Sequence, residues 1–122
     1  MKQNESREDY LERILMLEKE NGIVRAIDIA KALNFSKPSI SIALKKLKND
    51  ELIEIDENNH ITLTEEGRVV ATKTLEKHTV ISSLLQELGV SPETALEDAC
   101  KIEHDLSDET FKKIKEYYEK RH

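Results

Sequence analysis

The chain has 122 residues, of which 38% are hydrophobic and 36% charged, and a formal net charge of −6. This composition is typical of a folded, helix-rich protein and excludes a disordered one. There is no apolar run long enough to cross a bilayer, and the first residues have no apolar core of the kind a secretory signal needs. A lone cysteine, Cys100, cannot form an intramolecular disulfide and fits a reducing compartment. We therefore expect a cytoplasmic protein with no membrane partner.

The first part of the chain predicts three helices and a hairpin. Apolar residues at helical spacing indicate helices over residues 6–22 and 26–33, the first capped by Ser6 and the second with Ile27 and Ile29 facing inward. A third helix is expected up to residue 49, with Ser36 as its N-cap and Pro38 in its first turn. Apolar and polar residues then alternate over 52–55 and 61–63, on either side of a polar turn, which indicates a short β-hairpin.

Three further helices are predicted in the second part of the chain. A long helix should open at residues 64–66 and close at Gly89, a second should run from 91–93 to about 104, and Ser107 should cap a last one. The fold class is therefore mainly α with a small β-hairpin. The order of the first elements is that of a winged helix-turn-helix, which we place at residues 1–72, followed by a helical domain at 73–122.

The third predicted helix has features of a DNA-reading helix. Five lysines and no acidic residue lie between Lys31 and Lys48, although the chain as a whole is acidic. A local basic stripe of this kind can contact phosphates, while small polar residues at the start of the helix would face base edges. The candidate DNA-binding residues are Ser36, Lys37, Ser39, Ser41, Lys45, Lys46 and, at the hairpin tip, Asn59. The alternative is a small helical domain whose lysines form only a solvated helix face.

A second group of residues has the chemistry of a metal site. Cys100, Glu103 and His104 lie at i, i+3 and i+4 on one predicted helix, so a thiolate, a carboxylate and an imidazole share one face. Asp9 and Glu12 of the first helix, and His78 of the long helix, are candidates to join them. Each has an ordinary alternative: Asp9 as the capping partner of Ser6, Cys100 as a core residue, and the others as surface groups. A divalent cation would remove the repulsion between the acidic ligands and would tie the first helix to the later ones.

These residues lie in motifs that resemble the diphtheria-toxin-repressor family of iron- and manganese-dependent transcriptional regulators. The resemblance extends from Asp9 to about Ser107. Its motifs are Glu8-Asp9-Tyr10-Leu11, Leu63-Thr64-Glu65-Glu66-Gly67, Lys77-His78, and Ala99-Cys100-Lys101-Ile102-Glu103-His104-Asp105-Leu106-Ser107.

The resemblance implies a repressor, and not an enzyme, that binds a palindromic operator in double-stranded DNA as a homodimer and controls metal-homeostasis genes. It implies that the domain at 73–122 binds metal and dimerises. The implied metal ligands are Asp9, Glu12, His78, Cys100, Glu103 and His104, holding two divalent ions per chain, Mn²⁺ or Fe²⁺, with Zn²⁺, Cd²⁺ or Co²⁺ as substitutes in vitro.

One ligand position departs from the pattern of the family. The chain is closest to the short, manganese-responsive branch, whose members usually have glutamate at the position of Cys100, whereas iron-responsive members have cysteine there but methionine at the position of Asp9. A thiolate favours Fe²⁺ and softer ions over Mn²⁺. A second hypothesis is a metal-independent winged-helix regulator with a vestigial metal site.

Overall fold

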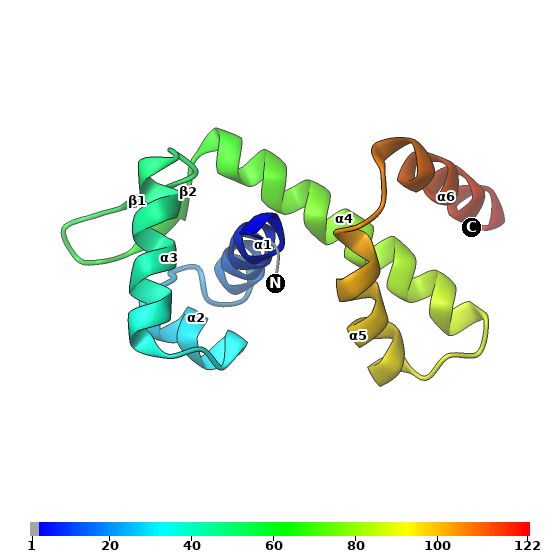
Figure 1. Cartoon of the computed structure of the whole chain (residues 1–122), viewed down its shortest axis with the longest axis horizontal. Coiled ribbons are helices and arrows are strands. Elements are labelled where there is room, and N and C mark those ends of the chain that lie inside the picture. The colour runs from blue at the N-terminus through cyan, green and yellow to red at the C-terminus, as the bar shows by residue number, and fades with distance from the viewer. Residues whose placement is uncertain (1–2) are drawn as a thin grey trace. The chain divides into compact units, whose positions relative to one another are not determined.

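The computed structural model describes the backbone of residues 3–122 and the side chains of residues 7–122. Over this range the fold is mainly α with one antiparallel hairpin, which confirms the predicted class (Figure 1). In chain order the elements are α1 (Gln3–Asn21), α2 (Ala26–Leu33), α3 (Lys37–Asn49), β1 (Ile53–Ile55), β2 (Ile61–Leu63), α4 (Glu65–Glu87), α5 (Pro92–Glu103) and α6 (Asp108–Arg121). Among the helices described, none combines the length and the apolar character that a membrane span requires.

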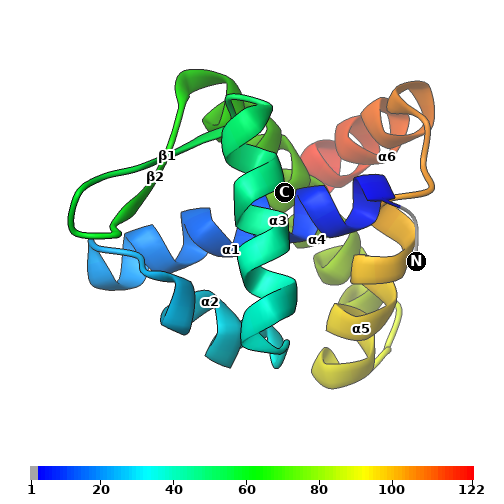
Figure 2. The same ribbon diagram turned by 60° about the vertical axis from the view of Figure 1, so that its left-hand side comes forward.

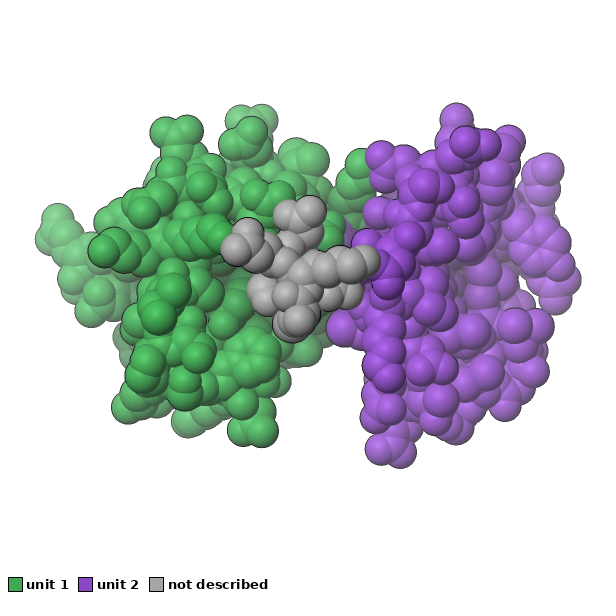
Figure 3. Space-filling model, viewed as in Figure 1, with its two compact units in different colours: residues 1–73 green, residues 74–122 purple. Residues whose placement is uncertain are grey.

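The chain divides into two compact units (Figure 3). We call Met1–Lys73 the winged-helix unit and Thr74–His122 the helical unit. The boundary falls inside α4, so this helix contributes its beginning to the first unit and its larger part to the second.

Three helices and the hairpin surround the core of the winged-helix unit. Helix α2 packs against α1 and α3, while α3 also contacts β1 and α1 contacts β2 (Figure 2). The face of α3 formed by Ile40, Leu44 and Leu47 is buried. Ser36 caps α3 as predicted, because its Oγ accepts a hydrogen bond from the backbone N–H of Ser39 at 3.4 Å.

The hairpin is short and held at both ends. Strands β1 and β2 pair in the register Ile53↔Leu63 and Ile55↔Ile61. In addition to this pairing, the backbone N–H of Ile61 donates to the carbonyl of Val24 at 2.8 Å, which fastens the hairpin to the loop between α1 and α2.

A single residue, Thr64, joins β2 to α4. Its hydroxyl donates to the carbonyl of Glu51 at 2.7 Å and accepts from the backbone N–H of Gly67 at 3.0 Å. Thr64 therefore caps α4 and is also bonded to the segment directly before β1. A Cβ atom added at Gly67 would lie 1.9 Å from the carbonyl oxygen of Leu52. Glycine is therefore required there by the close approach of two backbones, which explains the last residue of the Thr-Glu-Glu-Gly motif.

Two details of the predicted helices were wrong. Helix α1 begins at Gln3, so Ser6 lies inside it and does not cap it; no proline or glycine precedes Ser6 to stop the helix from extending. On α2, Ile29 is buried but Ile27 is 46% exposed. Successive helical residues are about 100° apart, so two residues separated by two positions cannot both face the core.

The helical unit has a smaller apolar core. The buried apolar residues of its described part are Val80 and Ile81 of α4, Ala95 and Ala99 of α5, and Phe111 of α6. Ser91 caps α5, within the range where that helix was expected to start, and Ser107 caps α6 as predicted. An ion pair between Lys115 of α6 and Glu76 (3.2 Å) and a hydrogen bond between Nε2 of His122, directly after α6, and Oε2 of Glu87 (2.9 Å) fasten this segment to α4.

Candidate metal centre and nucleic-acid interface

Four of the predicted metal ligands lie in the helical unit, on α4 and at the end of α5. Cys100 and Glu103 belong to the last turn of α5, and His104 follows as its C-cap with helical backbone angles (φ −80°, ψ −18°). Because the helical geometry continues through His104, the i, i+3 and i+4 spacing keeps the three side chains on one face. One potential ligand atom from each lies within 4.8 Å of the others.

Glu103 is the centre of this cluster. Its Oε2 lies 3.1 Å from Nδ1 of His78 on α4, and its Oε1 lies 3.4 Å from Nε2 of His104. The Glu103 side chain is completely buried, and that of His104 is 3% exposed. A buried carboxylate is costly unless charged or hydrogen-bonding groups surround it, and here an imidazole faces each of its oxygens.

The donor set fits a divalent transition metal. Two imidazole nitrogens, two carboxylate oxygens and a sulfur belong to the ligand types that bind such ions. Carboxylate and imidazole suit Mn²⁺ and Fe²⁺, whereas the Cys100 sulfur favours softer ions. We define this cluster of His78, Cys100, Glu103 and His104 as the candidate metal centre.

Asp9 and Glu12, the two remaining predicted ligands, lie on α1 in the winged-helix unit. Their spacing of three residues places them on the same side of the helix. Asp9 is half-buried and Glu12 is buried.

All seven predicted DNA-binding residues are exposed in the winged-helix unit. Ser41, Lys45 and Asn59 line a hollow of about 500 Å³ between α3 and the hairpin, where Lys48 joins them. Lys37 and Ser41 line a neighbouring hollow of about 250 Å³ between α3 and α2. The structure thus places Lys37, Ser41, Lys45 and Asn59 along two neighbouring hollows beside α3.

The two serines at the start of α3 have a structural role as well. The hydroxyl of Ser36 donates to that of Ser39 at 3.0 Å, in addition to capping the helix. Lys46 lies on the other flank of α3, away from the two hollows.

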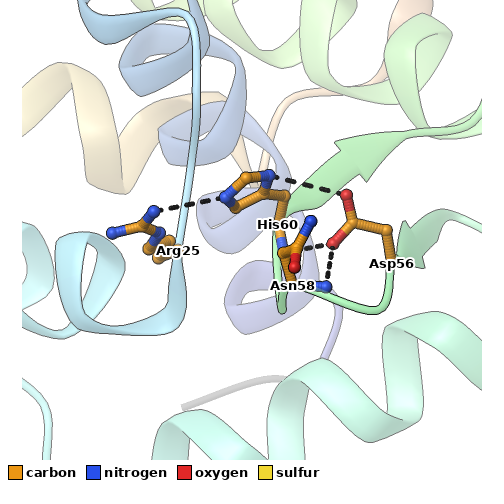
Figure 4. A network of polar contacts seen from close by, with 4 residues as sticks. All are labelled: Arg25, Asp56, Asn58 and His60. Atoms are coloured by element: carbon orange, nitrogen blue, oxygen red, sulfur yellow. Dashed lines mark hydrogen bonds and ion pairs between the residues drawn. The ribbon is translucent and has the colours of Figure 1, made fainter.

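Sequence reasoning missed Arg25, which also lines the larger hollow. Its Nη2 contacts Nε2 of His60 at 3.3 Å, and Nδ1 of His60 lies 3.5 Å from Oδ2 of Asp56 (Figure 4). The Asp56 carboxylate also accepts hydrogen bonds from the backbone N–H groups of His60 and Asn58, both at 2.8 Å. These bonds, that of His60 first, lower the pKa of Asp56.

This network connects the beginning of α2 to the hairpin turn. The residues Arg25 and His60 are 35 positions apart, so periodicity could not reveal the contact. The only local signal was a basic residue directly before a predicted helix.

Comparisons with known proteins match both units. A model of the iron dependent repressor N-terminal DNA binding domain matches residues 3–61, and a model of the iron dependent repressor metal binding and dimerisation domain matches residues 64–122. An uncharacterized HTH-type transcriptional regulator of Methanocaldococcus jannaschii is 41% identical over 119 residues, which are 96% of this chain and 95% of the relative. Transcriptional regulator MntR of Escherichia coli O157:H7 is 39% identical over 104 residues, 85% of this chain and 67% of the relative.

A solved structure, that of the manganese regulator SloR, has a similar fold. The TM-score is 0.80 at 28% identity, over 91% of this chain. The chain spans about half of that protein, 52% of its length.

A winged helix-turn-helix joined to a helical unit with this donor set defines a metal-dependent transcriptional regulator. The chain belongs to the family of iron dependent repressors, which confirms the resemblance found in its sequence motifs.

Proposed function

We propose that the chain is a cytoplasmic repressor of metal-homeostasis genes, which binds a palindromic operator as a homodimer when Mn²⁺ or Fe²⁺ occupies its metal centre. The observation that carries this proposal is the buried carboxylate of Glu103, which has an imidazole on each oxygen and a thiol nearby. The metal would act as an effector and not as a catalyst.

In this proposal the ligands of the metal site would come from both units. His78, Cys100, Glu103 and His104 would supply the ligands of the helical unit, and Asp9 and Glu12 of α1 would complete two sites per chain. Glu103 is suited to serve both ions, because each of its oxygens faces a different histidine. The bound cations would supply positive charge that offsets the repulsion among the acidic ligands.

Cys100 should decide the choice of metal. Its sulfur favours Fe²⁺, Zn²⁺, Cd²⁺ and Co²⁺ over Mn²⁺ relative to an oxygen ligand. We therefore expect Cys100→Glu to shift the preference toward Mn²⁺ in competition titrations of the reduced protein under anaerobic conditions. An unchanged order of affinities would contradict a direct role of the sulfur.

Binding of the metal would favour the DNA-competent arrangement of the protein. A ligand shifts such an equilibrium only by its difference in affinity for the two states. Ligands on α1 would give the metal a higher affinity for the DNA-competent state. Because α1 belongs to the winged-helix unit, a bound metal would then constrain the unit that binds DNA.

Helix α3 would enter the major groove, with Ser41 and Lys37 toward the bases and Lys45 and Lys46 toward phosphates. Ser36, Ser39 and Asn59 are the remaining proposed contacts. The support for this assignment is that all seven side chains are exposed and that α3 contains no acidic residue.

The test begins with DNA duplexes selected from a random pool by the wild-type protein in the presence of Mn²⁺. Fluorescence anisotropy then compares their affinity with Mn²⁺ and with a chelator, and elemental analysis of the anaerobic, reduced protein counts the bound metal. We expect at least about a tenfold loss of affinity on chelation, since allosteric coupling is commonly about 1–3 kcal/mol. Equal affinity with and without metal would favour the metal-independent regulator.

Matched variants separate the two parts of the proposal. Lys45→Glu should abolish binding to the selected DNA, whereas Lys113→Glu, the same charge change on an exposed lysine of α6, should not. Glu103→Gln should remove the metal response, whereas Glu97→Gln, on an exposed position of α5, should retain it. Loss of DNA binding in Lys113→Glu would indicate that overall charge, and not α3, carries the interaction.

A further inference from the structure

Ile42 is the most exposed large hydrophobic residue in the described part of the winged-helix unit. Its side chain is 71% exposed, although it lies in the middle of α3. Ile42 is two positions from Ile40 and two from Leu44, both buried, so it lies about 200° around the helix from each. It therefore projects from the side of α3 that faces away from the core.

The surroundings of Ile42 are polar and basic. Its neighbours one turn away on the exposed side are Ser39, Lys45 and Lys46, and the exposed ring of Pro38 precedes it by one turn. Ile42 lines neither of the two hollows beside α3. One isoleucine and one proline ring in a basic, acid-free setting are too small a surface for a stable protein partner, which covers about 800 Å² on each side.

The major groove of DNA offers one apolar group to such a side chain. Adenine, guanine and cytosine present hydrogen-bond donors and acceptors there, whereas thymine also presents its C5-methyl group. An isoleucine can make no hydrogen bond, so of the four bases only thymine has a group that it can pack against favourably.

We propose that Ile42 is a specificity-determining residue that reads thymine by packing against its C5-methyl group in the major groove. This inference rests on the proposed function of α3 as the DNA-reading helix. In this arrangement the lysines beside Ile42 hold the phosphates, and Ile42 supplies base discrimination that charge alone cannot give.

The test compares DNA duplexes that differ only in the C5-methyl group of one thymine. Duplexes are selected from a random pool by the wild-type protein with Mn²⁺, and each thymine of the selected sequence is then replaced in turn by uracil. Burial of one methyl group is worth about 0.8 kcal/mol, which corresponds to about a fourfold change in Kd. We expect this loss at one thymine position of each half-site and at none of the thymines outside the contacted bases.

Variants assign the effect to Ile42. In Ile42→Ala the ratio of affinities for the thymine and uracil duplexes should fall to about one, while Lys45→Ala should weaken binding to both duplexes and keep the ratio of about four. Because Ile42 is exposed, Ile42→Ala should leave the thermal unfolding of the protein unchanged, which excludes misfolding as the cause.

Three results would overturn the inference alone: selected sequences without thymine, equal affinity of the wild type for thymine and uracil duplexes, or an undiminished ratio in Ile42→Ala. A protein that selects no DNA at all would overturn the proposed function, and this inference with it.

Discussion

The two units differ in what fills their interiors. Of the buried apolar side chains among the described residues, fifteen belong to the winged-helix unit and five to the helical unit, and two of those five are alanines. Among the described polar side chains, the helical unit buries Thr74, Ser82 and Glu103, whereas the winged-helix unit buries Glu12. Apolar burial is the main source of folding free energy, so the winged-helix unit is stabilised mainly by its core. The helical unit, with less to bury, depends more on what its polar groups bind.

The largest effect should follow from a cavity in the apolar core of the winged-helix unit. Ile29 is completely buried, so Ile29→Ala should lower the free energy of unfolding by about 2–5 kcal/mol, measured by urea denaturation. The control is Ile27→Ala on the exposed side of the same helix, which should change it by about 0.5 kcal/mol or less. Equal losses in the two variants would show that α2 does not pack as described.

The second effect is a gain of stability in the helical unit on binding metal. At a Mn²⁺ concentration a hundred times Kd, the gain should be about 2.7 kcal/mol. Amide hydrogen exchange should slow in α5 more than in α2 when Mn²⁺ is added. Glu103→Gln should lose this protection, whereas Glu97→Gln should keep it. Protection confined to α2 would contradict the inference that the helical unit is the one stabilised by the metal.

Next in size is the steric effect at the β2–α4 junction. Gly67→Ala places a Cβ against the backbone of Leu52, so we expect a loss of about 1–3 kcal/mol or more in urea denaturation. Gly89, with φ of +104° and no atom near its missing Cβ, provides the matched case. Gly89→Ala should cost only about 1 kcal/mol, from backbone conformation alone. A smaller loss for Gly67→Ala than for Gly89→Ala would contradict the close approach.

The smallest effect concerns the hairpin turn and depends on pH. The pKa of Asp56 is lower in the folded chain than the usual value of about 3.9 for an aspartate. The ionised Asp56 carboxylate therefore stabilises the folded chain above that usual value, and this stabilisation is lost as pH falls through the lower pKa of the folded chain. As pH falls below that usual value, the exchange of the His60 and Asn58 amide protons should become faster relative to the rest of the unit. Asp56→Ala should remove this dependence on pH, and Glu57→Ala, at the adjacent exposed position, should retain it.

Local patterns predicted most of the fold. The helix starts at Ser36, Ser91 and Ser107, the position of Pro38 and the alternation around β1 and β2 each depend on residues close in sequence, and these were confirmed. The predicted start of α1 at Ser6 was wrong, because a good capping residue does not oblige a helix to begin there. The predicted inward position of Ile27 was wrong, because the helical angle that separates it from the buried Ile29 turns it away from the core.

Contacts distant in sequence were harder to predict. The spacing of Cys100, Glu103 and His104 predicted a shared face, whereas no spacing rule connects His78, 25 residues before Glu103, to that face. His78 was a candidate only as a possible ligand on another helix, which the family resemblance then supported. Arg25 and His60 had neither a spacing rule nor a family motif to connect them. The exposure of Ile42 likewise becomes evident only when the buried side of α3 is known, because isoleucine in a helix is ordinarily assigned to the core.

The junction at Thr64 has a mechanical consequence. Strand β2 ends at Leu63 and α4 begins at Glu65, so there is no flexible linker that could absorb a displacement between them. Thr64 is hydrogen-bonded on both sides, to Glu51 and to Gly67, and the glycine is wedged against Leu52. A displacement of the hairpin, for example on contact of its tip with a phosphate, would therefore be transmitted directly to the first turn of α4.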